Sequence, residues 1–200
     1  MLEKKSIFFQ LDYWKHLILR HNLDVMHIEK NVCDSLVGTF LNINGKSKDG
    51  IAARLDMVEM GIRPELAPDN IAGRTYLPPA CFTLKRDEKR QFCQILADVK
   101  VPEGYSSNIR NNVSMEELKL FGLKSHDCHI LMQNLLPVAI YSVLPERVRD
   151  AVTRLCMFFN IICSKLVDVE KLDSLQNDIA VTLCLLENIS HRHSSILWFI

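Results

Sequence analysis

The sequence predicts a mainly α-helical protein, and three observations support this prediction. Apolar side chains recur at helical spacing through most of the 200 residues. Alternation with a period of two, which is typical of a half-buried strand, occurs only over residues 7–10. Prolines and glycines gather over residues 62–79, where they exclude a long helix and predict an irregular connector in the middle of the chain. With 48% hydrophobic residues, the chain can bury a sizeable core.

In the first half, helices are expected over about residues 13–41 and 48–60, with a break in the first near His21 and Asn22. Gly45, Gly50 and Gly61 separate and end these helices. After the connector, the spacing predicts a third helix over about residues 85–99.

In the second half, Ser114 and the acidic residues after it have the pattern of a helix N-cap with an acidic first turn. Ser125 is expected to cap a helix over about residues 126–143, which Pro137 should kink. Pro145 suits a helix start, so further helices are expected up to about residue 166 and over about residues 169–189. Pro102, Gly104 and the polar residues 106–112 indicate a boundary between two parts of the chain.

The helix containing residues 20–34 holds the most informative side chains. On a helical wheel its apolar residues form one face, and Asp24 and His27 lie on another. Glu29 falls in the middle of the apolar face. A buried carboxylate must be paired, bound to a cation or neutral. Pairing with a nearby Lys or Arg is the favoured interpretation of Glu29, and a functional role is the alternative.

Composition excludes several classes of protein. The chain has 24 basic and 24 acidic residues, so it lacks the basic excess of a free-standing DNA-binding domain. Its seven scattered cysteines, mostly in apolar runs, indicate a reduced, intracellular protein with thiols in its core. No apolar run reaches the ~18 residues of a membrane span. The densest basic run is interrupted by acids and is interpreted as a solvated helix face rather than a DNA contact; it comprises Lys85, Arg86, Lys89 and Arg90.

Several segments resemble one family in the same order. The string RHNLDVMHIEKN within residues 20–34 resembles a signature of the transposases of plant CACTA-type (En/Spm-like) DNA elements. KDGIAARLDMVEMGIR, RTYLPPACFTL and KSHDCHILMQNLLPVAIYSVLP, together with the residues before the signature, extend the resemblance over nearly the whole chain. No P-loop, GxGxxG, GxSxG or HExxH motif points to another class of enzyme.

The resemblance implies a DDE-type enzyme with an RNase H-like core and a helical insertion, which binds transposon ends in the nucleus and uses Mg²⁺ or Mn²⁺ to cut and rejoin DNA. The family's first two Asp residues and its CPxC pair have no counterpart in this sequence. Residues 1–104 are therefore expected to be the C-terminal part of the catalytic region, and residues 105–190 the start of the helical domain that follows it. Residues 191–200 depart from the family pattern.

Three residues are candidates for the last acid of the DDE triad: Glu29, Asp24 and Asp127. Asp24 and Glu29 are roughly 140° apart on the helix, so they should not bind one ion together. For Asp24 and Asp127, an ordinary acid at a helix N-terminus is the alternative explanation.

Two groups could instead bind a softer metal. His21 and His27, with the CPxC pair of a longer chain, could complete a structural zinc site, although polar histidines without a metal are favoured. His126, Cys128 and His129 form a second cluster, but neighbours on a helix point in different directions.

The functional prediction is a fragment of a DNA transposase that is inactive alone. The alternative is a non-catalytic helical module that associates with full-length transposase or with itself. The abundance of apolar residues over 118–186 suggests this association. A third interpretation is a decayed reading frame with an unstable product.

Overall fold

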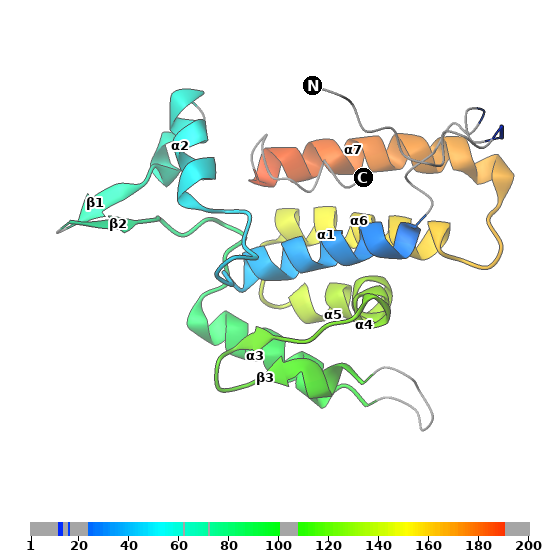
Figure 1. Ribbon diagram of the computed structural model, residues 1–200, viewed down its shortest axis with the longest axis horizontal. Helices are drawn as coiled ribbons and strands as arrows, with labels where there is room; N and C mark the ends of the chain where they lie inside the picture. Colours follow the sequence, from blue (N-terminus) through cyan, green and yellow to red (C-terminus); the bar gives the residue numbers. More distant parts are fainter. Residues whose placement is uncertain are drawn as a thin grey trace.

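The computed structural model describes residues 12–13, 16, 24–61, 63–71, 73–100 and 108–190. These residues are mainly α-helical, as the sequence predicts (Figure 1). The helices are α1 (Val25–Phe40), α2 (Ile51–Glu59), α3 (Arg86–Asp98), α4 (Ser125–Ile130), α5 (Leu136–Ile140), α6 (Glu146–Ile162) and α7 (Leu172–Ser190). Shorter 3₁₀ helices lie at Pro64–Leu66, Ile109–Asn112 and Val169–Lys171, and a π-helical segment, Leu131–Leu135, joins α4 to α5. None of the described helices is both long and apolar enough to cross a bilayer.

Two short hairpins lie where the sequence shows no period-two alternation. Strands β1 (Asp69–Ile71) and β2 (Arg74–Tyr76) pair antiparallel within the predicted irregular connector, with Asn70 opposite Thr75. All six of their residues are exposed, so no apolar alternation could reveal them. Gly73 supports the turn between them with a positive φ of 78°.

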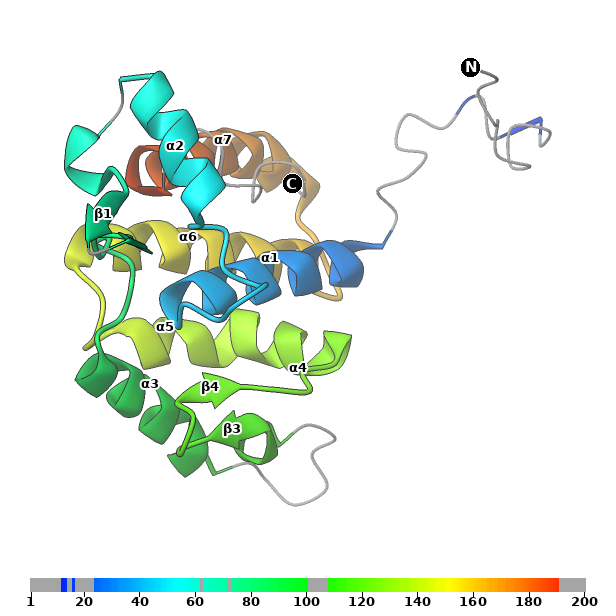
Figure 2. The same cartoon turned by 60° about the vertical axis from the view of Figure 1, so that its left-hand side comes forward.

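The second hairpin replaces the helix predicted after Ser114. Strands β3 (Val113–Ser114) and β4 (Lys119–Leu120) pair antiparallel beside α3 (Figure 2). The Ser114 hydroxyl does accept a hydrogen bond from the Glu117 backbone N–H, at 3.2 Å, as an N-cap would. The bond closes a turn instead, because Leu118 adopts a left-handed conformation with φ of 51° and returns the chain.

The core lies between the long helices. Helix α1 packs on α4 and the π segment, α6 packs on α7 and the π segment, and α3 packs on α5. One cluster of buried side chains runs from Val32 on α1 through Leu131 and Phe159 to Ile189 on α7. Residues on both sides of the predicted boundary at 104/105 thus contribute to one core; the division into two parts itself stays a prediction.

The C-terminal end of α1 is anchored to α3. The carbonyl of Phe40 accepts a hydrogen bond from the Leu84 N–H at 2.9 Å, and the carbonyl of Leu41 accepts one from the Lys89 side chain. Gly38 lets the following turn cross the helix closely, since a Cβ there would lie 2.7 Å from the Cβ of Lys46. These contacts fix the direction of α1, which carries Glu29.

Helix α2 and the β1–β2 hairpin form a lobe at one side of the helical body (Figure 1). Arg54 holds this lobe together with a side chain that is only 1% exposed. Its guanidinium donates to both carboxylate oxygens of Asp49 and to the carbonyls of Leu66 and Pro78, the latter two at 2.9 and 3.1 Å. Five N–H donors in a fixed fork make arginine suited to joining three segments at once.

Replacing Arg54 with alanine should therefore lower the free energy of unfolding by about 3–5 kcal/mol, because Asp49 and two carbonyls lose their partner inside the lobe. Urea denaturation followed by circular dichroism measures this change. Arg86→Ala, at an exposed position on α3, is the matched control and should change stability by no more than about 0.5 kcal/mol. Equal stability of the two variants would contradict the role of Arg54.

Candidate functional site

Glu29 is completely buried, as its place on the apolar face of α1 predicts. Its partner is not the Lys or Arg that the sequence favoured, so that prediction is wrong. The carboxylate oxygen Oε2 lies 2.6 Å from Nδ1 of His129, which is 100 residues away in the chain. The other oxygen, Oε1, accepts a hydrogen bond of 3.3 Å from the amide of Gln133. Lys30, the neighbour of Glu29, pairs with Asp34 instead.

The local backbone explains how His129 and Gln133 reach Glu29 together. They are four residues apart on the continuous α4–π–α5 rod, so their side chains lie on one face. Pro137 has no N–H to donate to the carbonyl of Gln133, the usual acceptor four residues back. The rod widens just before this proline, and the N–H of Leu136 bonds to the carbonyl of Leu131, five residues back. The kink predicted at Pro137 is thus a π-helical segment, and it contains Gln133.

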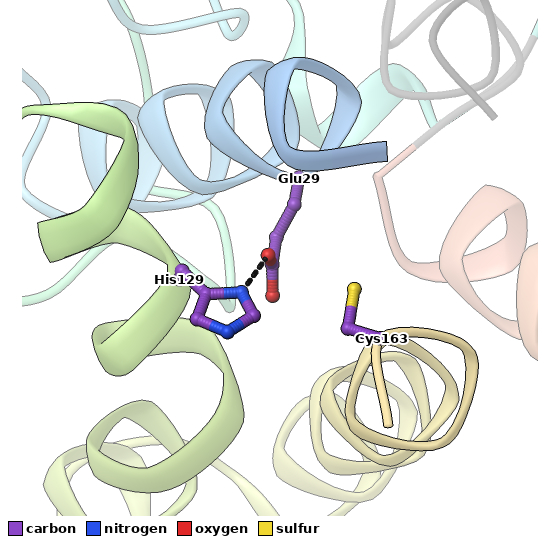
Figure 3. Close-up of side chains that lie close together, drawn as sticks. All are labelled: Glu29, His129 and Cys163. Carbon is purple, nitrogen blue, oxygen red and sulfur yellow. Dashed lines mark hydrogen bonds and ion pairs between the residues drawn. The ribbon is translucent and has the colours of Figure 1, made fainter. Parts of the chain in front are cut away.

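Cys163 completes the group from a third helix. It follows the last residue of α6, where its own N–H bonds back to the carbonyls of Phe159 and Ile161. Figure 3 shows Glu29 projecting from α1 into the space between His129 and Cys163. One ligand atom from each of the three residues lies within 4.8 Å of the others. Glu29 has no exposed area, whereas the His129 side chain is 23% exposed and Cys163 is half-buried. The group is therefore open to solvent only through His129 and Cys163.

Burial sets the proton affinities in this group. It raises the pKa of Glu29 above its ordinary value, and hydrogen bonds from His129 and Gln133 and the charge of His129 only partly oppose it. Burial and the negative charge of Glu29 also raise the pKa of the Cys163 thiol. The same two causes raise the pKa of Cys156 to about 12. Glu29 and His129 thus share a short hydrogen bond in which Nδ1–H donates to the carboxylate, or the protonated carboxyl donates to Nδ1.

The other two candidate acids lie at helix N-termini. Asp24 is the N-cap of α1, exposed, and accepts a hydrogen bond of 3.0 Å from the backbone N–H of His27. Asp127 lies in the first turn of α4 and accepts one of 2.9 Å from the backbone N–H of Lys124. Both thus occupy the positions of ordinary helix-terminal acids, which was the alternative explanation.

Of the two predicted zinc ligands, His21 and His27, the structure describes only His27. His27 is exposed in the first turn of α1 and is not part of the Glu29 group. His21 lies outside the described residues. The zinc site expected of this pair stays a prediction.

The second histidine and cysteine cluster divides along the helix, as neighbours on a helix should. His129 faces Glu29, while Cys128 is buried against Cys33 of α1. His126 is exposed, with its ring stacked 6.4 Å from that of His129. Only His129 of this cluster therefore belongs to the candidate site.

The basic run on α3 is a solvated helix face with one inward side chain. Lys85, Arg86 and Arg90 are exposed. Lys89 instead reaches the end of α1, and burial lowers the pKa of its amine. One of the four basic residues, Lys89, thus has a structural role.

The described residues do not fit a two-ion Mg²⁺ site. Such a site needs several converging carboxylates, because Mg²⁺ prefers oxygen ligands. Within the described ranges, the group of three or more metal-ligating side chains is Glu29, His129 and Cys163, which holds one carboxylate. No step of strand transfer can be derived from these residues alone.

Comparison of the chain with protein-family models, with curated proteins and with solved structures gave no match. The resemblance to transposases therefore stays an expectation from motifs in the sequence.

Two members of the site were missed in the sequence. Gln133 could have been found, because it follows His129 by four residues on a predicted helix. Cys163 gives no such signal, since it is one of several cysteines in apolar runs. Its proximity to Glu29 arises only when α6 packs against the π segment.

The raised pKa of Glu29 predicts a specific pH dependence. A carboxyl with a raised pKa binds its proton more tightly in the folded than in the unfolded state. Its contribution to stability is complete below about pH 4.5 and is lost as the pH rises through the folded-state pKa. In Glu29→Gln no proton is lost, so the free energy of unfolding of this variant, relative to the native chain, should increase across that interval. Denaturant titrations with EDTA present measure the difference.

Glu59→Gln, at an exposed position at the end of α2, gives the background effect of removing a surface carboxylate. A stability difference for Glu29→Gln that falls with rising pH, or that parallels the Glu59→Gln background, would show that Glu29 does not carry a raised pKa.

Proposed function

We propose that this chain is the helical part of a CACTA-type transposase region and that it takes part in DNA strand cleavage and transfer together with acids from a longer enzyme. The RNase H-like sheet of the family would come from that longer enzyme, with α1 as the helix that supplies one acid. The ions would be Mg²⁺ or Mn²⁺, the partner the DNA of transposon ends and the compartment the nucleus. The order of the family-like motifs along the chain supports the proposal.

The separation of the candidate acids supports the part of the proposal in which a longer enzyme supplies further acids. Asp24 caps α1, Asp127 in the first turn of α4 accepts from a backbone N–H, and Glu29 is enclosed by His129 and Gln133. Three acids with three different sets of partners do not form a site for two ions. The chain by itself therefore has no activity in this proposal.

Exposure selects the acid that this chain contributes. Mg²⁺ keeps several of its waters and binds through one or two carboxylates together with substrate phosphates. DNA and hydrated ions can reach Asp24, which is exposed at the N-terminus of α1 within the family signature. A DNA phosphate, or an ion that keeps several of its waters, cannot reach Glu29, whose two oxygens face protein donors and which has no exposed area of its own. We assign the role to Asp24.

Asp24→Asn in a longer transposase that contains this region should lower Mg²⁺-dependent strand cleavage by more than about 100-fold, a larger effect than the loss of an outer-shell residue. Asparagine caps helices as well as aspartate does, so α1 should stay folded. Cleavage of labelled transposon ends measures the rate, and Asp127→Asn is the matched control at the other helix N-terminus. Full activity of Asp24→Asn, or Mg²⁺-dependent cleavage by the 200-residue chain alone, would contradict the proposal.

A second candidate function is the helical interaction module, and α2 favours it. Ile51, Leu55 and Val58 are 48%, 53% and 47% exposed and lie within one narrow stripe of the helix. This stripe, rather than the back half of the chain that the sequence indicated, is the surface proposed to associate with a second copy. A stripe on a helix at one side of the body can pack against the same stripe of a partner related by two-fold symmetry.

Replacing the stripe residues with serine in one triple variant should then shift the chain from dimer to monomer in sedimentation experiments, because the apolar contact area between the copies is lost. Val138→Ser, at a position 61% exposed on α5, removes an apolar side chain elsewhere and should leave the dimer intact. A native chain that sediments as a monomer at all concentrations would eliminate this function.

A further inference from the structure

We propose that Glu29, His129 and Cys163 bind one transition-metal ion such as Zn²⁺ in this chain. This site is separate from any Mg²⁺ site used in strand transfer. The three residues come from α1, α4 and the end of α6, which are far apart in the sequence. A bound ion would connect these three helices at a single point.

The spacing of the ligand atoms is close to that of a tetrahedral site. Zinc bonds of about 2.0–2.3 Å place neighbouring ligand atoms roughly 3.3–3.6 Å apart. Oε2 of Glu29 and Nδ1 of His129 are 2.6 Å apart, so an ion would replace their hydrogen bond and separate them slightly. Cys163 Sγ, within 4.8 Å of a carboxylate oxygen of Glu29 and a ring nitrogen of His129, would move inward. Cys163 lies at a helix end, where a small shift disturbs few contacts.

The ligand types select the ion. One thiolate, one imidazole and one carboxylate suit Zn²⁺, whereas Mg²⁺ requires oxygen ligands in octahedral geometry. Three protein ligands leave a fourth position for water or another ligand, as in open zinc sites. On binding, the Cys163 thiol would release its proton to solvent, because the thiolate is the ligand. The proton shared by Glu29 and Nδ1 of His129 would also leave, to Nε2 of the same ring or to solvent. The negative charges of Glu29 and the thiolate would balance the two charges of the ion.

Gln133 supports the site from outside the ligand set. Its amide nitrogen lies 3.0 Å from Nδ1 of His129, donates to Oε1 of Glu29 at 3.3 Å and approaches the carbonyl of Phe159 at 3.4 Å. The bond to Glu29 holds Oε1, while Oε2 is the oxygen joined to the His129 ring. Contacts of this kind orient ligands and typically change metal affinity 10–100-fold when they are removed. The partial exposure of His129 and Cys163 provides the entry path for the ion.

Titration of the reduced, EDTA-treated chain with Co²⁺ tests the site, because a cobalt–thiolate bond gives a charge-transfer absorption band. We expect one Co²⁺ per chain, with a band that Zn²⁺ abolishes. Cys163→Ser should lose the band, and Glu29→Gln and His129→Gln should weaken binding at least tenfold. Gln133→Ala should weaken it about 10–100-fold. The matched control is Cys184→Ser, which removes an exposed thiol on α7 and should keep the band.

Circular dichroism establishes that each variant is folded, and the glutamine variants decide the question should Cys163→Ser not fold. No stoichiometric binding by the native chain, or an unchanged band in Cys163→Ser, would overturn the proposal. Asp24→Asn should keep the cobalt band, although it is expected to stop cleavage by the longer enzyme. The metal site and the proposed transposase role can therefore fail separately.

Discussion

The carboxylate of Glu29 imposes the strongest constraint on the helical body, because an unpaired charge at a fully buried position would cost several kcal/mol. Protein donors must replace the lost water, and they come from elsewhere in the chain. His129 and Gln133 supply them, and both belong to the rod that packs on α1. The same contact that partly pairs the acid thus fixes how α1 meets the α4–π–α5 rod. It also brings the end of α6 next to the carboxylate, since α6 packs on the π segment.

The π segment shows how Pro137 influences the helix that carries His129 and Gln133. Pro137 removes a single backbone donor, and the helix before it widens to five-residue hydrogen bonding. Leu131 and Met132 in the widened turn remain completely buried, while Gln133 from the same turn faces the acid. In a regular helix, the angle about the helix axis between His129 and the buried residues after Gln133 would be different. The polar pair and the apolar core are thus accommodated on one rod by a local change in helix geometry.

The sequence predicted the parts of the fold that depend on long apolar repeats and failed where a few residues decide. Helices α1, α3, α6 and α7 were expected near their observed positions, because each has apolar residues at helical spacing that become buried. The hairpins were missed, since exposed three-residue strands leave no pattern and Ser114 makes the same bond in a turn as in a cap. The buried position of Glu29 followed from the helical wheel. Its partner did not, because a contact across 100 residues depends on packing that a single sequence does not encode locally.

Arg54 and Glu29 show two different ways of burying a charge, and the difference bears on function. Arg54 is matched by a carboxylate and two carbonyls, which accept four hydrogen bonds from its guanidinium, so its charge is paired and its role in the lobe is structural. Glu29 has only a histidine and an amide, and a thiol with a raised pKa lies beside it. Its own pKa is raised as well, so the surrounding protein does not fully stabilise the charge. A cation would supply the missing stabilisation. This incomplete pairing is the physical reason for regarding the Glu29 group, rather than the better-paired Arg54 group, as a site that binds something.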